Sequence, residues 1–322
     1  MKSNLSATQK TIVKILFVEK ESSRSILAKR LSLTNAALTL ALKPLLESDI
    51  VLETKNDVQR VGRKELLLTL NRKYGYFLGI DIRKHHQYFY LMDLGGNLIS
   101  SSDDNAISLS DFIRSKKKKI ISIGVTLRGF LKENVLEERY PQLYKEIENL
   151  GLPVYVFNNV DCLADIYIMH HEEDKNFLLV KYGPGVGSSI YVNGHPLGSL
   201  SELGHTYYQD KTLEETISYS ALLDMDFEET EATKLILEDR NMRDKVLKVL
   251  SFALVNADAL LSLQKIVLSG QLLSDEKTVN DLKKEIQSIK KEFDHSKLVV
   301  YPDYHELNMK KSCIGALIRT FD

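Results

Sequence analysis

The chain has 322 residues, of which 43% are hydrophobic and 27% are charged. This composition is typical of a folded protein of about two domains and excludes collagen-like, wholly disordered and membrane-bundle proteins. No apolar stretch approaches the roughly 18 residues that a membrane span requires, and the polar start lacks the apolar core of a signal peptide. We therefore expect a cytoplasmic protein. Cys162 and Cys313 lie far apart and suggest neither a disulfide framework nor a zinc site.

The net charge of −1 is distributed unevenly along the chain. Residues 1–73 contain 14 Lys and Arg against 7 Asp and Glu, a net of +7, and the remainder contains 29 against 37, a net of −8. A basic segment joined to an acidic body is the pattern expected when one part contacts nucleic-acid phosphates. Chance clustering on a solvated surface explains the charge alone equally well. The pattern of elements has to separate these two interpretations.

Three helices are predicted within the basic segment. Apolar residues recur at helical spacing over residues 8–18, Ser22 or Ser23 can cap a second helix over 24–31, and Thr34 can cap a third after a short turn. Apolar residues gather on one side of the third helix: Leu38, Leu42, Leu45 and Leu46. Its other side is short or polar, as in a helix that enters a major groove, and supplies the predicted DNA contacts: Thr34, Asn35, Ala36, Thr39 and Lys43. Pro44 predicts a kink or break in this helix.

Two strands are predicted after the third helix, over residues 50–54 and 65–70. The basic, Gly-containing segment between them predicts a wing whose tip reaches phosphates or a minor groove. Its predicted DNA contacts are Arg60, Arg63 and Lys64. Modules of three helices and a hairpin also serve as protein-interaction domains, but position, basicity and the wing favour DNA binding. Residues 1–72 therefore predict a winged helix-turn-helix DNA-binding domain.

From residue 73 onward, strands alternate with helices and predict an α/β body over residues 73–322. A helix is predicted over residues 137–150, and strands over residues 76–81, 86–93, 98–100, 120–125, 153–157, 177–181 and 188–192. The loop Gly183-Pro184-Gly185 between the last two strands has two interpretations: backbone amides that face a phosphate, or a tight hairpin. Both need the conformational freedom of glycine, so both remain open.

Short motifs recur along the whole chain in a specific order and spacing: Gly62-Arg63-Lys64, residues 74–81, 93–98, 153–159 and 183–187, Glu202-Leu203-Gly204-His205 and residues 314–317. In these motifs the sequence resembles the ROK family, and in particular its transcriptional repressors with an N-terminal winged helix. The resemblance implies an α/β fold in which a winged helix-turn-helix precedes a two-lobed, actin-like and ribonuclease H-like body with a sugar-binding cleft. It also implies that the C-terminal helix returns to the first lobe.

The resemblance also exposes four departures from the family's sugar kinases. Asn159 stands where the kinases have the general-base Asp, and an amide cannot accept a proton at neutral pH. Asp81 of the first phosphate hairpin is followed by Ile82 instead of glycine, and Pro184 in the second loop supplies no backbone donor. Ser269 stands where the adenosine-side loop usually has glycine. We therefore expect no kinase activity, no enzyme function and no cofactor.

The zinc site of the family is incomplete in this chain. The resemblance implies three cysteines beside the His of Gly204-His205, but no cysteine occurs between His205 and Glu214. We expect no metal there, and we expect Tyr207 and Tyr208 to hold the loop by packing. The adjacent histidines 85–86 and 170–171 diverge on any regular element and predict no metal site either.

The sugar-contacting residues implied by the resemblance are Asn158, Asn159, Glu202, His205 and Glu214. Carboxylates beside amides suit vicinal hydroxyl groups, because together they accept and donate hydrogen bonds. Each residue alone has a plainer interpretation, as a surface residue or, for His205, as a hydrogen-bonded core histidine.

The sequence thus predicts a sugar-responsive transcriptional regulator, a repressor, that binds operator DNA as a homodimer or a dimer of dimers. Its effector would be a sugar or a sugar phosphate, and it would have no membrane partner. Two alternatives stay open: a sugar kinase with an attached DNA-binding domain, and a sugar-insensitive regulator controlled by a protein partner. The sequence does not identify the sugar, the operator or the direction of the response.

Overall fold

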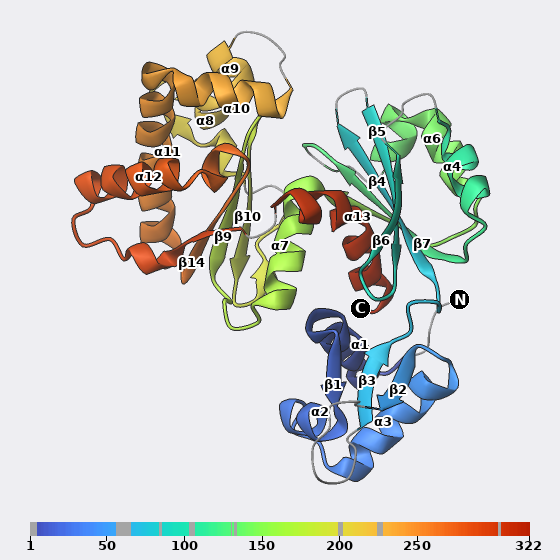
Figure 1. The fold of residues 1–322 in the computed structure, drawn as a ribbon. Coiled ribbons are helices and arrows are strands. Elements are labelled where there is room, and N and C mark those ends of the chain that lie inside the picture. The colour runs from blue at the N-terminus through green and yellow to red at the C-terminus, as the bar shows by residue number, and fades with distance from the viewer. Residues whose placement is uncertain are drawn as a thin grey trace. The chain divides into compact units, whose positions relative to one another are not determined.

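The computed structural model describes residues 5–55, 66–83, 86–102, 107–129, 131, 134–198, 202–223, 228–301 and 304–322 (Figure 1). The chain divides into two compact units: unit 1 comprises Met1–Asn159 and Met309–Asp322, and unit 2 comprises Val160–Asn308. The end of the chain therefore belongs to the same unit as its beginning. Among the described helices, none has both the length and the apolarity to cross a membrane.

The N-terminal part of unit 1 is a module of three helices and a small sheet (Figure 1). Its elements are α1 (Ala7–Glu19), β1 (Glu21–Ser23), α2 (Arg24–Arg30), α3 (Asn35–Glu47), β2 (Val51–Lys55) and β3 (Leu66–Leu70). The caps lie where the sequence predicts them: the side chain of Ser23 accepts from the Ile26 amide, and that of Thr34 accepts from the Ala37 amide. β1 is a strand that the pattern did not predict, and it pairs antiparallel with β3, whose other neighbour is β2.

α3 continues through Pro44 to Glu47, so the break predicted there does not occur. Proline removes the amide that would bond to the carbonyl of Leu40, but Leu40 is exposed and water can bond to that carbonyl. Leu42 and Leu45 are fully buried on either side of Pro44 and hold the helix against the core. Tertiary packing thus outweighs the local preference of proline.

The body of unit 1 is a five-stranded sheet in the order β6-β5-β4-β7-β8. Its strands are β4 (Tyr76–Arg83), β5 (His86–Asp93), β6 (Leu98–Ser102), β7 (Ile120–Leu127) and β8 (Val154–Asn158). The β6-β5 and β5-β4 pairs are antiparallel, and the β4-β7 and β7-β8 pairs are parallel. Three helices cover one face of the sheet: α4 (Leu109–Lys116), α5 (Val135–Arg139) and α6 (Pro141–Glu148). The single helix predicted over 137–150 is wrong, because Pro141 starts a new helix and Tyr140 before it leaves helical geometry.

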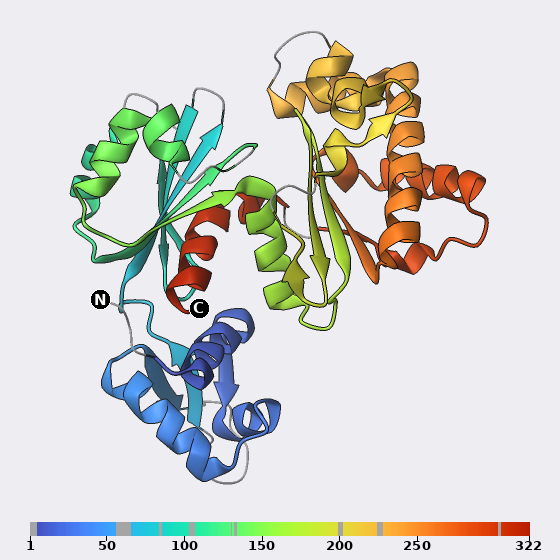
Figure 2. The same ribbon diagram turned by 180° about the vertical axis from the view of Figure 1, so that it is seen from behind.

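The other face of this sheet is covered by the last helix, α13 (Tyr304–Thr320) (Figures 1 and 2). Gly79 of β4 and Gly124 of β7 lie side by side in the sheet register. A Cβ atom added to Gly124 would lie 1.9 Å from the carbonyl oxygen of Ser312. The two glycines therefore permit the backbone of α13 to approach the sheet closely.

Unit 2 contains a second five-stranded sheet, in the order β11-β10-β9-β14-β15. Its strands are β9 (Phe177–Tyr182), β10 (Val186–Val192), β11 (His195–Pro196), β14 (Lys265–Ser269) and β15 (Leu298–Val300). The β11-β10 and β10-β9 pairs are antiparallel and the β9-β14 and β14-β15 pairs are parallel, as in unit 1. The two sheets therefore share one topology.

Helices cover both faces of the second sheet (Figure 2). α7 (Asn159–His170) packs on one face. The other face is covered by α8 (Leu213–Ile217), α9 (Tyr219–Leu223), α10 (Glu229–Glu238), α11 (Arg240–Leu261) and α12 (Glu276–Ile289). Short elements complete the unit: η1 (Leu203–His205), β12 (Tyr207–Tyr208), β13 (Lys211–Thr212), η2 (Leu272–Ser274) and η3 (His295–Lys297). Cys162 in α7 and Cys313 in α13 are buried and are not joined to each other by a disulfide.

Candidate functional site

The outward side of α3 carries the polar residues that the sequence singled out. Thr34, Asn35, Ala36, Thr39 and Lys43 are all exposed. The hydroxyl of Thr34 is occupied by the helix cap, at 3.2 Å from the Ala37 amide. The hydroxyl of Thr39 donates to the carbonyl of Asn35 at 2.8 Å, and the ammonium of Lys43 lies 3.8 Å from a Glu47 carboxylate oxygen. Asn35 therefore has the exposed side-chain amide of this face, and Lys43 its exposed ammonium.

Arg24 is a cation at this surface that sequence reasoning missed. Its Nε donates to the Glu53 carboxylate at 2.7 Å, and its Nη1 donates to the Thr39 hydroxyl at 3.4 Å. These bonds join α2, α3 and β2 beside the exposed side of α3. The three predicted wing residues, Arg60, Arg63 and Lys64, lie outside the described residues.

Asp81, in the first hairpin of the body, is fully engaged within unit 1. Its Oδ2 accepts from Lys311 Nζ at 2.6 Å and from Arg83 Nε at 2.7 Å, and its Oδ1 accepts from the Thr126 hydroxyl at 2.7 Å. Burial alone would raise the pKa of Asp81, but the Lys311 ammonium and the Arg83 guanidinium outweigh it and hold that pKa well below its usual range. Lys311 is itself 1% exposed. The charge of the Asp81 carboxylate is therefore compensated by cations of unit 1 itself.

The loop Gly183-Pro184-Gly185 closes a tight hairpin between β9 and β10. The Gly183 amide donates to the Gly185 carbonyl at 3.0 Å, and the Ser220 hydroxyl donates to the Pro184 carbonyl at 3.0 Å. A carboxylate oxygen of Glu214 accepts from the Val186 amide at 3.0 Å, and it would lie 3.0 Å from a Cβ atom at Gly185. A negative group therefore borders the loop.

Glu202, His205 and Glu214 come together in unit 2 at the first residues of β10. The Ser188 hydroxyl of β10 accepts from the Leu203 amide at 2.6 Å, which fixes the η1 turn between Glu202 and His205. His205 Nε2 lies 3.4 Å from Glu202 Oε2. Gly204 packs so closely on β10 that a Cβ atom there would lie 2.0 Å from the Val186 carbonyl oxygen. This close packing brings η1 and α8 to the same end of β10.

Asp161 is a further carboxylate at this place that sequence reasoning missed. It lies in the first turn of α7 and is hydrogen-bonded to Ser189. Burial raises the pKa of Glu202, His205 opposes this, and the carboxylates of Glu214 and Asp161 raise it further. Burial raises the pKa of Asp161 as well. The signal was available, since Asp161 follows Asn159 by two residues, but a lone carboxylate in a helix is not distinctive.

Asn158 and Asn159 lie at the junction of β8 and α7, in unit 1. Asn158 is buried, and its Nδ2 donates to the Gly129 carbonyl at 3.1 Å. Asn159 is half-buried and is the first residue of α7. Part of the Asn158 amide thus serves the fold, while Asn159 begins the helix turn that contains Asp161.

The loop that would bind zinc in the family is here the small hairpin β12-β13. Tyr208 packs its ring edge-on against Phe252 at 5.4 Å between centroids and adds to the core of unit 2. Tyr207 is 70% exposed, so the expectation that both tyrosines hold the loop is wrong for Tyr207. Thr212 and Glu215 form a capping box that starts α8 directly after the hairpin.

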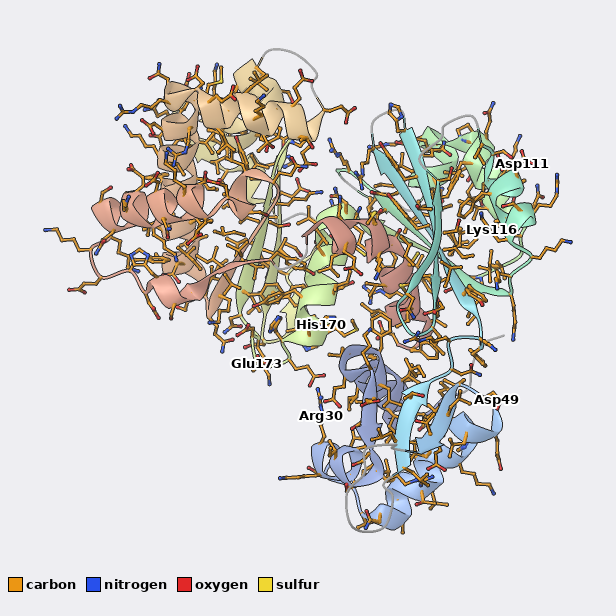
Figure 3. The ribbon with its side chains drawn as sticks, viewed as in Figure 1. Arg30, Asp49, Asp111, Lys116, His170 and Glu173 are labelled. Carbon is orange, nitrogen blue, oxygen red and sulfur yellow. The ribbon has the colours of Figure 1, made fainter. Side chains whose placement is uncertain are left out.

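A cluster of potential metal ligands lies directly after the end of α7 and includes Glu173, which Figure 3 labels together with His170. His171, Glu173 and Asp174 have ligand atoms within 4.8 Å of one another. Two of these side chains have structural contacts, because Tyr167 donates to Asp174 at 2.7 Å and stacks on His171 at 4.5 Å. We therefore assign this cluster to packing at the end of the helix.

The N-terminal module of α1 to α3 and β1 to β3, which we call the winged module, and the two sheets of one topology define a class of protein: a winged helix joined to an actin-like α/β body. The sequence signature of the ROK family matches residues 104–319. The chain therefore belongs to the ROK family.

Similar proteins include both repressors and sugar kinases. The chain is 23% identical to the xylose repressor of Staphylococcus xylosus over 228 residues, which cover 62% of this chain and 60% of that repressor's length. A ROK family transcriptional regulator, a homologue of the E. coli MLC protein, shares the fold with a TM-score of 0.69 at 20% identity, over 98% of this chain and 99% of the other. A ROK hexokinase from Thermus thermophilus covers 76% of this chain and 99% of its own, with a TM-score of 0.59 at 16% identity.

Proposed function

We propose that this protein is a sugar-responsive transcriptional repressor that binds operator DNA and has no kinase activity. The observation that carries the proposal is the winged module on a ROK body, in a fold shared over nearly the whole chain with a ROK transcriptional regulator. The sequence similarity to xylose repressors supports the same function. Cytoplasmic location and assembly as a homodimer or dimer of dimers are parts of this proposal.

The DNA-binding part of the proposal rests on the exposed side of α3. Residues 1–73 carry a net charge of +7, which suits a polyanionic partner. Asn35 and Lys43 present an amide and an ammonium from α3, and Arg24 lies beside them. An amide can bond to adenine and a cation to phosphate or guanine. We assign residues 1–72 as the DNA-binding domain and residues 73–322 as the sugar-sensing domain.

The effector part of the proposal rests on the carboxylates of unit 2. Glu202, Glu214 and Asp161 lie close enough that two of them raise the pKa of the third. A phosphate group would meet repulsion there, whereas sugar hydroxyls can donate to carboxylates and accept from His205. We therefore favour an uncharged sugar over a sugar phosphate. Asn158 and Asn159, at the end of β8 and the start of α7, are the other two residues that we propose as sugar contacts.

The absence of kinase activity is proposed on three features of this chain. Asn159 cannot act as a general base. Asp81 is saturated by Lys311, Arg83 and Thr126, so its oxygens are not available to a magnesium ion. Pro184 supplies no amide, and Glu214 borders the same loop. Phosphoryl transfer needs cations at the phosphates, but Lys311 and Arg83 are ion-paired with Asp81, and the second loop is bordered by the Glu214 carboxylate.

The mechanism that follows is a population shift. A bound sugar would favour one conformation of the body over others, and the winged modules of a dimer would change their spacing on DNA. A preference of about 1–3 kcal/mol would change operator affinity roughly 5- to 150-fold. No chemical step is required for regulation of this size.

The DNA-binding part is tested by selecting binding sites from random duplexes with the full chain. We expect a palindromic sequence whose affinity falls with salt concentration. Lys43→Ala, Arg63→Ala and Lys64→Ala should weaken binding to all sequences, while Asn35→Ala should relax the preference at one position. Selection of no palindrome would contradict the proposal.

The effector part is tested by a thermal-shift screen of monosaccharides and their phosphates. Each sugar that binds is then incubated with ATP and magnesium while ADP is measured. We expect unphosphorylated sugars to shift the melting temperature, Glu202→Gln to reduce the shift, and no sugar-dependent ADP to form. Sugar-dependent ADP release would establish the kinase alternative, and failure of every carbohydrate would favour control by a protein partner.

A further inference from the structure

Leu40 is an apolar residue at the centre of the outward side of α3. Its side chain is 73% exposed, whereas Leu38 and Leu42, two residues before and after it, are buried. Two residues correspond to about 200° around an α-helix, so Leu40 points directly away from the core. The helical pattern of the sequence explains the buried leucines and leaves Leu40 without a role in folding.

The neighbours of Leu40 on this side are those of a DNA-reading surface. Ala36 is exposed and lies one turn earlier on the same side of the helix. Lys43 follows by three residues, and Thr39 precedes it with its hydroxyl bonded to the Asn35 carbonyl. The N-terminal half of α3, which in a recognition helix contacts base edges, thus presents two apolar side chains next to a cation.

Only one group in the major groove suits an exposed leucine. The edges of guanine, cytosine and adenine present hydrogen-bond donors and acceptors, which leucine cannot satisfy, whereas thymine adds the apolar C5-methyl group. Phosphate oxygens also need donors, so Leu40 would weaken a contact to the DNA backbone. Burial of the leucine against a methyl group removes apolar area of both from water.

We propose that Leu40, with Ala36 beside it, packs against a thymine methyl group in each half of the operator and makes the protein selective for thymine there. This inference rests on the proposed DNA binding and adds a sequence-reading contact that the polar residues of α3 do not supply.

The test uses the selected operator, remade with deoxyuridine in place of each thymidine in turn. Deoxyuridine keeps every hydrogen-bonding group and lacks only the methyl. We expect the wild-type chain to lose about fourfold in affinity at one position of each half-site, the amount for one buried methyl or methylene group. Leu40→Ala should bind the thymidine operator more weakly and should no longer distinguish it from the deoxyuridine operator.

Two variants serve as controls. Leu260→Ala removes another exposed leucine, in α11 of unit 2, and should leave the ratio of thymidine to deoxyuridine affinity unchanged. Leu40→Met keeps an apolar side chain and should keep part of the ratio.

The outcomes separate this inference from the proposed function. If the wild type selects no duplex, the proposed DNA binding itself fails. If it selects an operator but every deoxyuridine substitution is neutral, or if Leu40→Ala keeps the wild-type ratio, DNA binding stands and the thymine contact is wrong.

Discussion

The two sheets of this protein have the same strand order and directions but opposite electrostatics at their first hairpins. In unit 1, Asp81 near the end of β4 is neutralised by Lys311 and Arg83. In unit 2, the hairpin after β9 is bordered by Glu214, and burial together with the carboxylates of Glu214 and Asp161 raises the pKa of Glu202. One topology thus supports a saturated ion-pair network in one place and an unsaturated acidic site in the other.

This difference indicates that the first hairpin of unit 1 stabilises the fold, whereas the first hairpin of unit 2 can bind a ligand. A buried ion pair with every oxygen bonded fixes α13 onto the first sheet and offers nothing to a ligand. Carboxylates whose pKa values are raised are held in an unfavourable state, which a hydroxyl-rich ligand can relieve. Substitutions in the two units should therefore have different consequences.

The largest expected loss of stability follows a substitution of Asp81, in the ion-pair network of unit 1. Asp81→Asn leaves Lys311 buried without its counter-charge, and we expect a loss of about 3–5 kcal/mol in the free energy of unfolding. Because the pKa of Asp81 is lowered by folding, its stabilisation is present above about pH 4 and is lost as the pH falls. Urea unfolding between pH 7 and pH 3 measures both effects.

The matched control for this change is Asp281→Asn in unit 2. Asp281 also faces two cations, Arg243 and Lys284, but its side chain is 25% exposed, against 3% for that of Asp81. Its loss should be much smaller, since water replaces the partner. Equal effects of the two substitutions would show that the burial of Lys311 is unimportant.

The second largest loss of stability is expected where α13 packs closely on the first sheet. Gly124→Ala places a methyl group against the Ser312 carbonyl, and we expect a loss of about 1–3 kcal/mol from overpacking. Gly95→Ala is the control, because its new methyl would meet the flexible side chain of Arg72 at 3.0 Å. A stable Gly124→Ala protein with an unchanged unfolding midpoint would disprove the close approach of α13.

The carboxylates of unit 2 lead us to expect that sugar binding depends on pH. Because burial and neighbouring carboxylates raise the pKa of Glu202, acidification should protonate it earlier than an ordinary glutamate and remove a charged acceptor. We expect sugar affinity to fall about fivefold through this titration, the difference between a charged and a neutral hydrogen bond. Calorimetric titrations at several pH values test this, and Glu202→Gln should remove the dependence.

The smallest effects concern the hairpin β12-β13. Tyr208→Ala removes the contact with Phe252 and should lower the free energy of unfolding by about 0.5–1.5 kcal/mol for the lost aromatic pair. Tyr207→Ala should change little, because Tyr207 is exposed.

If packing replaces zinc, a chelator should leave the melting temperature unchanged, and elemental analysis should find far less than one zinc per chain. Stoichiometric zinc would overturn this interpretation of His205.

Local signals explain why most elements could be predicted. Ser23 and Thr34 begin their helices at the predicted residues, because a cap depends only on a side chain and an amide three residues later. The Asn193-Gly194 turn that joins β10 to β11 is equally local, with φ values of 54° and 79° at two residue types that tolerate positive φ. The helix continues through Pro44 because packing outweighs the local preference of proline, whereas the division at Pro141 follows that preference, which the helical pattern of residues 137–150 hides.

The sequence by itself determined the class of fold and the family, because periodicity, caps and motif order are properties of neighbouring residues. Only the tertiary structure decided how the charged residues are used. Lys311 and Asp81 are 230 residues apart in the sequence, yet their side chains form an ion pair. Asp161, Glu202 and Glu214 come from three separate segments, yet Asp161 and Glu214 lie close enough to raise the pKa of Glu202. A sheet with two covered faces brings such distant residues together, and the energy of a charge depends on what surrounds it in space.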